Sequence, residues 1–218
     1  MKKIMFKDKY GLTKAVLEGR KTMTRRVVPE KLFDSYCDYN DYVISVAPRD
    51  IPCSREYEKE FFLRRSRFEV GEVVAVAQSY RDIRDIIGDV HDGKSIKFMP
   101  GWSNKMFVRA DLMPHKIRIT NVRVERLHDI SDEDCIREGI EEDSPYYWVP
   151  VNKSLPNWRK IEEGVSDMYP NDRDGKVYPH FWDSPRKAFA ALIDKISGKG
   201  TWEINPWVFV YEFELAND

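Results

Sequence analysis

Four basic residues and two threonines stand together in the segment 20–26, directly after Gly19. A threonine hydroxyl is inert as a nucleophile until a base removes its proton. A lysine amine can remove it only where desolvation or nearby cations lower the pKa of that lysine. The segment therefore holds the side chains needed to hydrolyse an amide. Taken alone, however, it is better explained by Arg20 and Lys21 complementing the negative end of a preceding helix.

The spacing of Gly19, Lys21 and Arg26 resembles the Gly-x-Lys-x-x-Glu-x-Arg signature of the ASCH domains, a branch of the PUA-like superfamily. This chain has Thr24 where the signature has glutamate. The run Gly-Arg-Lys-Thr-Met-Thr is in this respect similar to the small bacterial ASCH enzymes that hydrolyse N-acetylated cytidine. Those enzymes use a lysine and a threonine from this segment together with a glutamate from a later helix.

A later segment, residues 131–138, has the pattern of a short capped helix that begins at Ser131 and stops at Gly139. Glu138 falls in its last turn, where the helix dipole disfavours a carboxylate by about 0.3–1 kcal/mol. Solvent exposure, or pairing with a cation such as Lys21, would offset this cost. The Thr-Glu-x-x-Ala-x-x-Glu motif of the acetylcytidine hydrolases resembles this segment, and the resemblance puts their catalytic glutamate at Glu138.

The resemblance implies a metal-independent amidohydrolase that acts on an N-acylated cytidine or a related modified nucleoside. Lys21 would be the proton acceptor, Thr24 the nucleophile, and Glu138 the proton donor to the leaving amine. Arg20 and Arg26 would bind the ligand, since a guanidinium group can donate to a carbonyl oxygen or a phosphate. In an ideal strand Lys21 and Thr24 point to opposite faces, so they can meet only if the lysine belongs to a turn.

Two other classes of function stay open. A non-catalytic module could bind RNA or a modified base in the same cleft, as many PUA-like domains do. A structural or phage-associated accessory protein with a degenerate site is the third and weaker alternative. The threonine at position 24 favours the enzyme.

Composition limits the partners. The chain has 218 residues, 42% hydrophobic and 33% charged, which suits one globular domain spanning residues 1–218. Its formal net charge of −1 argues against a general nucleic-acid coat protein and restricts any RNA contact to a local surface. With no long apolar segment we expect no membrane partner, and we expect a cytoplasmic monomer. We expect no metal or other cofactor, because the histidines and cysteines are isolated: His91, His115, His128, His180, Cys37, Cys53 and Cys135.

The pattern of strands and helices that must position these residues predicts an α+β fold. The resemblance implies that this fold is a PUA-like (ASCH) β-barrel with peripheral helices. Strands are expected at 22–28, 73–77, 106–124 and 207–215, and a change of apolar parity at Thr120 predicts a bulge or bend that would help the barrel close. Helices are expected at 11–18, 131–138 and 185–197, with the first ended by Gly19 in a left-handed conformation.

Three long insertions interrupt the resemblance, at about 30–67, 81–103 and 141–184. The first is irregular in pattern and ends in Arg64-Arg65-Ser66-Arg67, which could touch phosphate, although we interpret it as solvated charge. The second is expected to be a loop. The third holds eight aromatic residues. They could stack on a base, but we favour a cover over a hydrophobic edge of the barrel.

Overall fold

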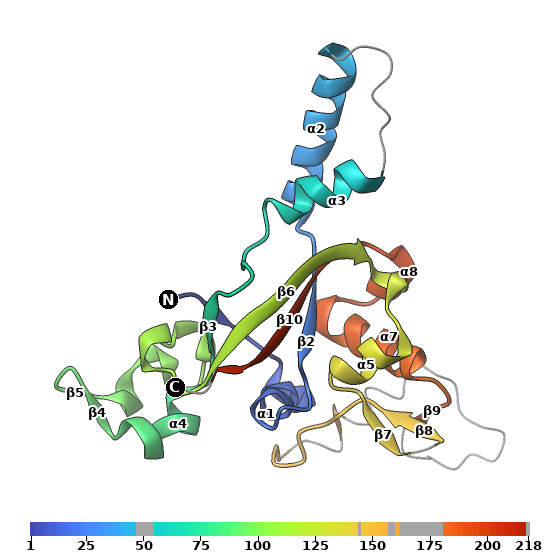
Figure 1. Cartoon of the computed structure of the whole chain (residues 1–218). Coiled ribbons are helices and arrows are strands. Elements are labelled where there is room, and N and C mark those ends of the chain that lie inside the picture. Colours follow the sequence, from blue (N-terminus) through green and yellow to red (C-terminus); the bar gives the residue numbers. More distant parts are fainter. Residues whose placement is uncertain (47–54, 144, 157–159, 162–180, 217–218) are drawn as a thin grey trace.

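One five-stranded sheet organises the chain in the computed structural model, which describes residues 1–46, 55–143, 145–156, 160–161 and 181–216 (Figure 1). The strand order is β1-β3-β6-β10-β2. The bounds are β1 Lys3–Ile4, β2 Met23–Val27, β3 Val73–Val76, β6 Lys116–Arg126 and β10 Trp207–Ala216. The combination of this sheet with several helices confirms the α+β class.

Strand β10 lies inside the sheet, next to the edge strand β2, and pairs antiparallel with both β6 and β2. Its alternating aromatic residues bury one face, as the sequence pattern predicts. Along β6, Asn121 pairs with Glu212 and Ile119 pairs with Phe213, so Thr120 is an extra residue opposite β10. The bulge predicted at this position is therefore confirmed.

The sheet is open, and the prediction of a closed β-barrel is wrong for the described residues. Its edges are β1, which pairs in parallel with β3, and β2, which pairs with β10. Strand β1 is only two residues long, because the chain turns at residues 8–10 toward the first helix before it could pair with β2. A side chain joins these two edges instead: Arg26 Nη2 of β2 donates to the Met5 carbonyl at 2.5 Å.

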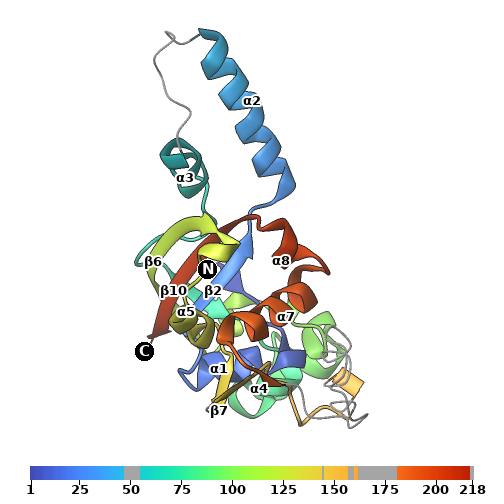
Figure 2. The same cartoon turned by 90° about the vertical axis from the view of Figure 1, so that its right-hand side faces the viewer.

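The predicted peripheral helices are present. They are α1 Leu12–Leu17, α5 Asp132–Arg137 and α7 Pro185–Ser197, followed by α8 Thr201–Ile204. Gly19 has the left-handed φ of +72° that ends the first helical segment. The Ser131 hydroxyl caps α5 by accepting from the Asp134 N–H, and Ser184 caps α7 through Lys187. Helices α5 and α7 lie beside each other next to β2 (Figures 1 and 2).

The first insertion contains two helices, α2 Glu30–Val46 and α3 Arg55–Leu63, which project from one end of the sheet (Figures 1 and 2). The irregular excursion predicted here is thus largely helical, although residues 47–54 lie outside the described part. Tyr36 packs edge-on against Phe61, and the Phe62 ring lies 6.1 Å from Trp207 of the sheet. These aromatic contacts fix the base of the two helices.

The second insertion is not the predicted loop. It contains α4 Tyr80–Ile87, capped by Ser79, and a hairpin of β4 Val90–His91 and β5 Lys94–Ser95. Met106 and Phe107, predicted as strand, are instead exposed in a 3-10 turn at 105–107 that Asn104 caps. Further short 3-10 segments lie at 96–98, 100–102, 110–112 and 127–129. Tyr80 and Ile83 give this region a small core against β3.

The third insertion forms a second small sheet of β7 Glu141–Asp143, β8 Tyr146–Trp148 and β9 Phe181–Trp182. Trp182 is buried in the main core and the Tyr146 and Phe181 rings pack 4.2 Å apart, while most of residues 157–180 lies outside the described part. Over the described chain, the helices are too short or too polar to cross a bilayer.

Candidate functional site

A buried ion pair between Lys21 and Glu138 joins the turn after α1 to the end of α5. Lys21 Nζ lies 2.6 Å from Glu138 Oε2 and also donates to the Glu138 carbonyl at 2.6 Å. The two side chains are only 2% and 5% exposed. The backbone N–H of Lys21 donates to the Ala15 carbonyl, so this lysine belongs to the turn and not to β2. The condition under which Lys21 and Thr24 can meet is thereby fulfilled.

A second cation binds the other oxygen of Glu138. Arg25 Nη1 lies 3.3 Å from Glu138 Oε1, while its Nη2 contacts Asp134 at 2.7 Å and Glu125 at 2.6 Å. Arg25 has no exposed side-chain surface. Although burial lowers the pKa of Arg25, these carboxylates outweigh it and raise that pKa above its ordinary value. Glu138 is therefore bound by two cations at a helix end that would otherwise disfavour a carboxylate.

Burial lowers the pKa of Lys21, and the charges of Arg26 and Arg25 add to the lowering, while Glu138 opposes it. Desolvation dominates, because the amine is enclosed on all sides. A lysine of lowered pKa is a better proton acceptor near neutral pH than an exposed one. The environment is thus of the kind that the chemistry requires.

Thr24 lines the same small cavity as this pair. The cavity has a volume of about 20 Å³, which is about the room for one water molecule, and Arg26 and Phe6 also line it. Within the described part of the chain, the Thr24 hydroxyl has no hydrogen-bond partner, although the residue is buried. The structure thus brings together Lys21, Thr24, Arg26 and Glu138, while their catalytic and ligand-binding roles stay predictions.

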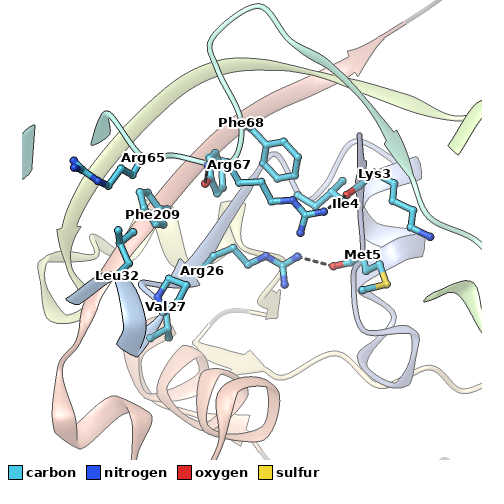
Figure 3. A pocket seen from close by; sticks show the side chains of 12 residues that line it. Lys3, Ile4, Met5, Arg26, Val27, Leu32, Arg65, Arg67, Phe68 and Phe209 are labelled. Carbon is cyan, nitrogen blue, oxygen red and sulfur yellow. Dashed lines mark hydrogen bonds between the residues drawn. The ribbon is translucent and has the colours of Figure 1, made fainter. Parts of the chain in front are cut away.

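A larger pocket of about 320 Å³ lies next to this cavity, and Arg26 lines both of them (Figure 3). The guanidinium of Arg26 also lies over the Phe6 ring, with 5.7 Å between Cζ and the ring centre. The pocket occupies the gap between the two edges of the open sheet. Its lining residues are Lys3, Ile4, Met5, Arg26, Val27, Pro29, Leu32, Arg65, Arg67, Phe68, Phe209 and Tyr211.

Arg20 does not line either of these two pockets. Its half-exposed side chain pairs with Glu18 at 2.8 Å and with Glu141 at 3.6 Å. It follows the left-handed Gly19 in the turn and is directed to the surface, whereas the next residue, Lys21, is directed inward. The structure therefore places Arg20 apart from the other predicted site residues.

Sequence reasoning did not identify Arg25 as the second cation on Glu138, nor Arg67 and Tyr211 as pocket residues. Arg25 directly follows Thr24 in β2, so the two side chains point to opposite faces of the strand. A charged side chain that is buried in a strand needs a partner of opposite charge, and this requirement could have indicated the role of Arg25. No local pattern indicates Tyr211, because its position depends on the pairing of β10 with β2.

Among the described residues, no group of three or more His, Cys, Asp or Glu side chains could hold a metal ion. Comparisons with protein-family models, with curated proteins and with solved structures gave no match. The resemblance to the ASCH domains therefore depends on the sequence motifs alone.

Proposed function

We propose that this protein is a metal-independent amidohydrolase that acts on an N-acylated cytidine or a related modified nucleoside. One observation carries the proposal: a buried lysine of lowered pKa, a carboxylate held by two cations and a threonine hydroxyl without a partner share one cavity. The sequence resemblance to the acetylcytidine hydrolases assigns the same three residues, Lys21, Thr24 and Glu138.

The reaction would proceed through an acyl-threonine. The neutral Lys21 amine takes the proton from Thr24 Oγ1, and this oxygen attacks the acyl carbon of the amide. The C–N bond then breaks, and the leaving amine receives the proton from Lys21 by way of the Glu138 carboxylate. Water hydrolyses the resulting ester in the second half-reaction, which releases the carboxylic acid and restores the Thr24 hydroxyl.

Access to Thr24 requires movement of Arg26. The small cavity holds about one water and cannot hold a nucleoside, whereas the adjacent pocket of about 320 Å³ is within the range of small-molecule sites. A nucleoside in the larger pocket would extend its acyl group past Arg26, whose guanidinium is joined to the Met5 carbonyl by a hydrogen bond.

The test is release of acetate from N-acetylcytidine. Thr24→Val and Lys21→Met should each lower kcat/KM by about 1,000-fold or more, with a much smaller effect on binding, because both groups act on the transition state. Thr22→Val is the matched control, since Thr22 lies two residues away and its hydroxyl accepts from Arg137 outside the cavity. Turnover by Thr24→Val equal to that of the wild-type protein would exclude this nucleophile.

The second candidate function is a non-catalytic reader of a modified base or RNA. The aromatic wall of the larger pocket favours it, because Phe68, Phe209 and Tyr211 offer surfaces on which a base can stack. A reader would bind N-acylated cytidines without releasing acetate. Absence of turnover by the wild-type protein over a panel of such compounds, with binding still measurable, would favour the reader over the enzyme.

A further inference from the structure

Two guanidinium groups face each other across the larger pocket without an ion-pair partner, although the charge of Glu138 in the adjacent cavity acts on Arg26. Arg26 extends from β2 and Arg67 from the segment before β3, and Figure 3 shows their guanidinium ends near each other, whereas Arg65 points to the outer end of the pocket. Among the described residues, neither Arg26 nor Arg67 has a carboxylate partner. The lining residues of this pocket include no aspartate or glutamate.

Arginines elsewhere in this protein are bound in two ways: the half-buried Arg126 and Arg186 donate to backbone carbonyls, whereas those around α5 bind carboxylates. Around α5, the cations Arg25, Arg123 and Arg137 are matched by carboxylates of the neighbouring strands and helix: Glu125, Asp134, Glu138 and Glu212. The larger pocket thus carries the positive charges of Arg26 and Arg67 with no carboxylate in its lining. Two like charges held together in a partly enclosed site favour binding of an anion between them.

Arg67 is an exposed residue whose backbone is held by contacts with the sheet and the N-terminal segment. Its backbone N–H lies 3.3 Å from the Tyr211 hydroxyl, which also accepts from Ser66 Oγ at 3.1 Å. Its carbonyl accepts from Lys2 Nζ at 2.7 Å. The Tyr211 contacts join the end of the first insertion to the interior strand β10, so the guanidinium is presented from an ordered backbone.

Lys3 is not part of the charged pair, although it lines the pocket. Its ammonium donates to the carbonyls of Met106 at 2.6 Å and Val108 at 2.8 Å and is turned away from the arginines (Figure 3). Arg65 is held by its own helix, because its guanidinium lies 3.6 Å from the centre of the Phe61 ring. The anion-binding groups are therefore Arg26 and Arg67.

We propose that this pocket binds a nucleotide, with the phosphate between Arg26 and Arg67 and the base against Phe68 and Phe209. The volume of about 320 Å³ suits one nucleotide. A phosphate bound to Arg26 also competes with the Met5 carbonyl for this guanidinium, which would loosen the contact that closes the way to Thr24. The claim that this nucleotide is a substrate rests on the proposed amidohydrolase function. The claim that the pocket binds a nucleotide does not depend on that function.

The test compares the binding of cytidine monophosphate and cytidine by calorimetry at one fixed, low salt concentration. The wild-type protein should bind the monophosphate about tenfold or more tightly than the nucleoside. Arg67→Gln should remove most of this preference, and Arg67→Lys should keep part of it as a point charge. The matched control is Arg64→Gln, because Arg64 is 74% exposed, pairs with Glu60 and does not line the pocket; it should keep the full preference.

Several outcomes would overturn the proposal. They are equal affinity of the wild-type protein for both ligands, an unchanged preference in a folded Arg67→Gln variant, inorganic phosphate binding as tightly as the nucleotide, and binding of a cytidine-containing oligonucleotide but not of the mononucleotide.

The same experiment separates this proposal from the proposed function, because cytidine monophosphate carries no acyl group and cannot be turned over. If it binds through Arg67 while N-acetylcytidine is not hydrolysed, the nucleotide site stands and the amidohydrolase fails. If N-acetylcytidine is hydrolysed without any preference for a phosphate, the reverse holds.

Discussion

Glu138 is the residue on which the candidate site depends. Each of its carboxylate oxygens is bound by a different cation, Lys21 on one side and Arg25 on the other, and all three side chains are nearly or completely enclosed. Enclosed charges that lose their partner are much more costly than exposed ones. The ion pair should therefore make a measurable contribution to stability as well as to chemistry.

A double-mutant cycle tests this contribution. Glu138→Gln should lower the free energy of unfolding by about 3–5 kcal/mol, because it leaves the buried Lys21 without its carboxylate. Lys21→Met should cost less, because Arg25 still pairs with Glu138. The double variant should lose clearly less than the sum of the two, since it leaves neither charge of the pair behind. Urea denaturation followed by circular dichroism measures all four proteins.

The control for this cycle is the exposed pair Lys14–Glu18, which is 3.6 Å apart on the surface of α1. Its coupling should be about 0.5 kcal/mol or less, because water screens both charges. A buried pair with a coupling as small as this surface pair would contradict the description of Lys21 and Glu138 as mutually dependent.

The lowered pKa of Lys21 predicts a pH dependence of stability. Burial sets it below the ordinary value of 10.5. Between the lowered pKa and 10.5, the unfolded chain binds the Lys21 proton more than the folded chain does, so this group makes the free energy of unfolding rise with pH in that window. The difference in unfolding free energy between wild type and Lys21→Met should therefore grow in favour of wild type as the pH rises from the lowered pKa of Lys21 toward 10.5. A constant difference would show that Lys21 titrates normally.

Part of the site could be predicted at this scale, because local signals place its residues. Gly19 directs the chain so that Lys21 lies in a turn, and the Ser131 cap fixes where α5 ends and hence where Glu138 lies. Arg67 could not be predicted in the same way. Its place depends on the hydroxyl of Tyr211, a residue of a distant strand.

At the scale of elements, the junction after α5 is the most sensitive. Gly139 has a φ of +103°, and a Cβ there would lie 3.3 Å from Leu12 Cδ2 and 3.6 Å from Lys21 Cδ. Gly139→Ala should therefore lower the free energy of unfolding by about 1–2 kcal/mol through the backbone alone, with a further loss from contact with Leu12.

The matched comparison is Gly19→Ala. Gly19 also has a left-handed φ, of +72°, but no atom lies within 4 Å of a Cβ added there. It should show only the backbone cost, so it should be less destabilised than Gly139→Ala in urea denaturation. Equal losses for the two variants would mean that the space beside Lys21 is not restrictive.

The helices at 131–138 and 185–197 and the strand at 207–215 could be predicted because caps and periodicity are properties of short segments. Helix α4 could not. It buries only Tyr80 and Ile83, which is too short an apolar stripe to stand out among the surrounding aspartates and glycines. The helices of the first insertion were missed for a related reason, since α2 buries Tyr36 alone.

For the whole molecule, closure of the sheet could not be read from local patterns. The parity change at Thr120 gives the bulge correctly, yet a bend in one strand does not decide whether the outer strands meet. That depends on the length of β1, which ends at Ile4 because the chain turns toward α1. The resulting gap is occupied by the larger pocket, so the error in the predicted architecture lies where the candidate ligand would bind.

The position of β10 between β6 and β2 has a kinetic consequence. The sheet can form only after this strand, residues 207–216, has paired with β2 at residues 23–27 and with β6 at residues 116–126. Pairing between such distant segments loses loop-closure entropy before any contact is gained, and it slows folding to milliseconds, seconds or longer. Thr24 faces its partner Tyr211 only after this step. In a refolding experiment, binding and hydrolysis should thus return together with the sheet, in one late phase, and no early intermediate should carry a partial activity.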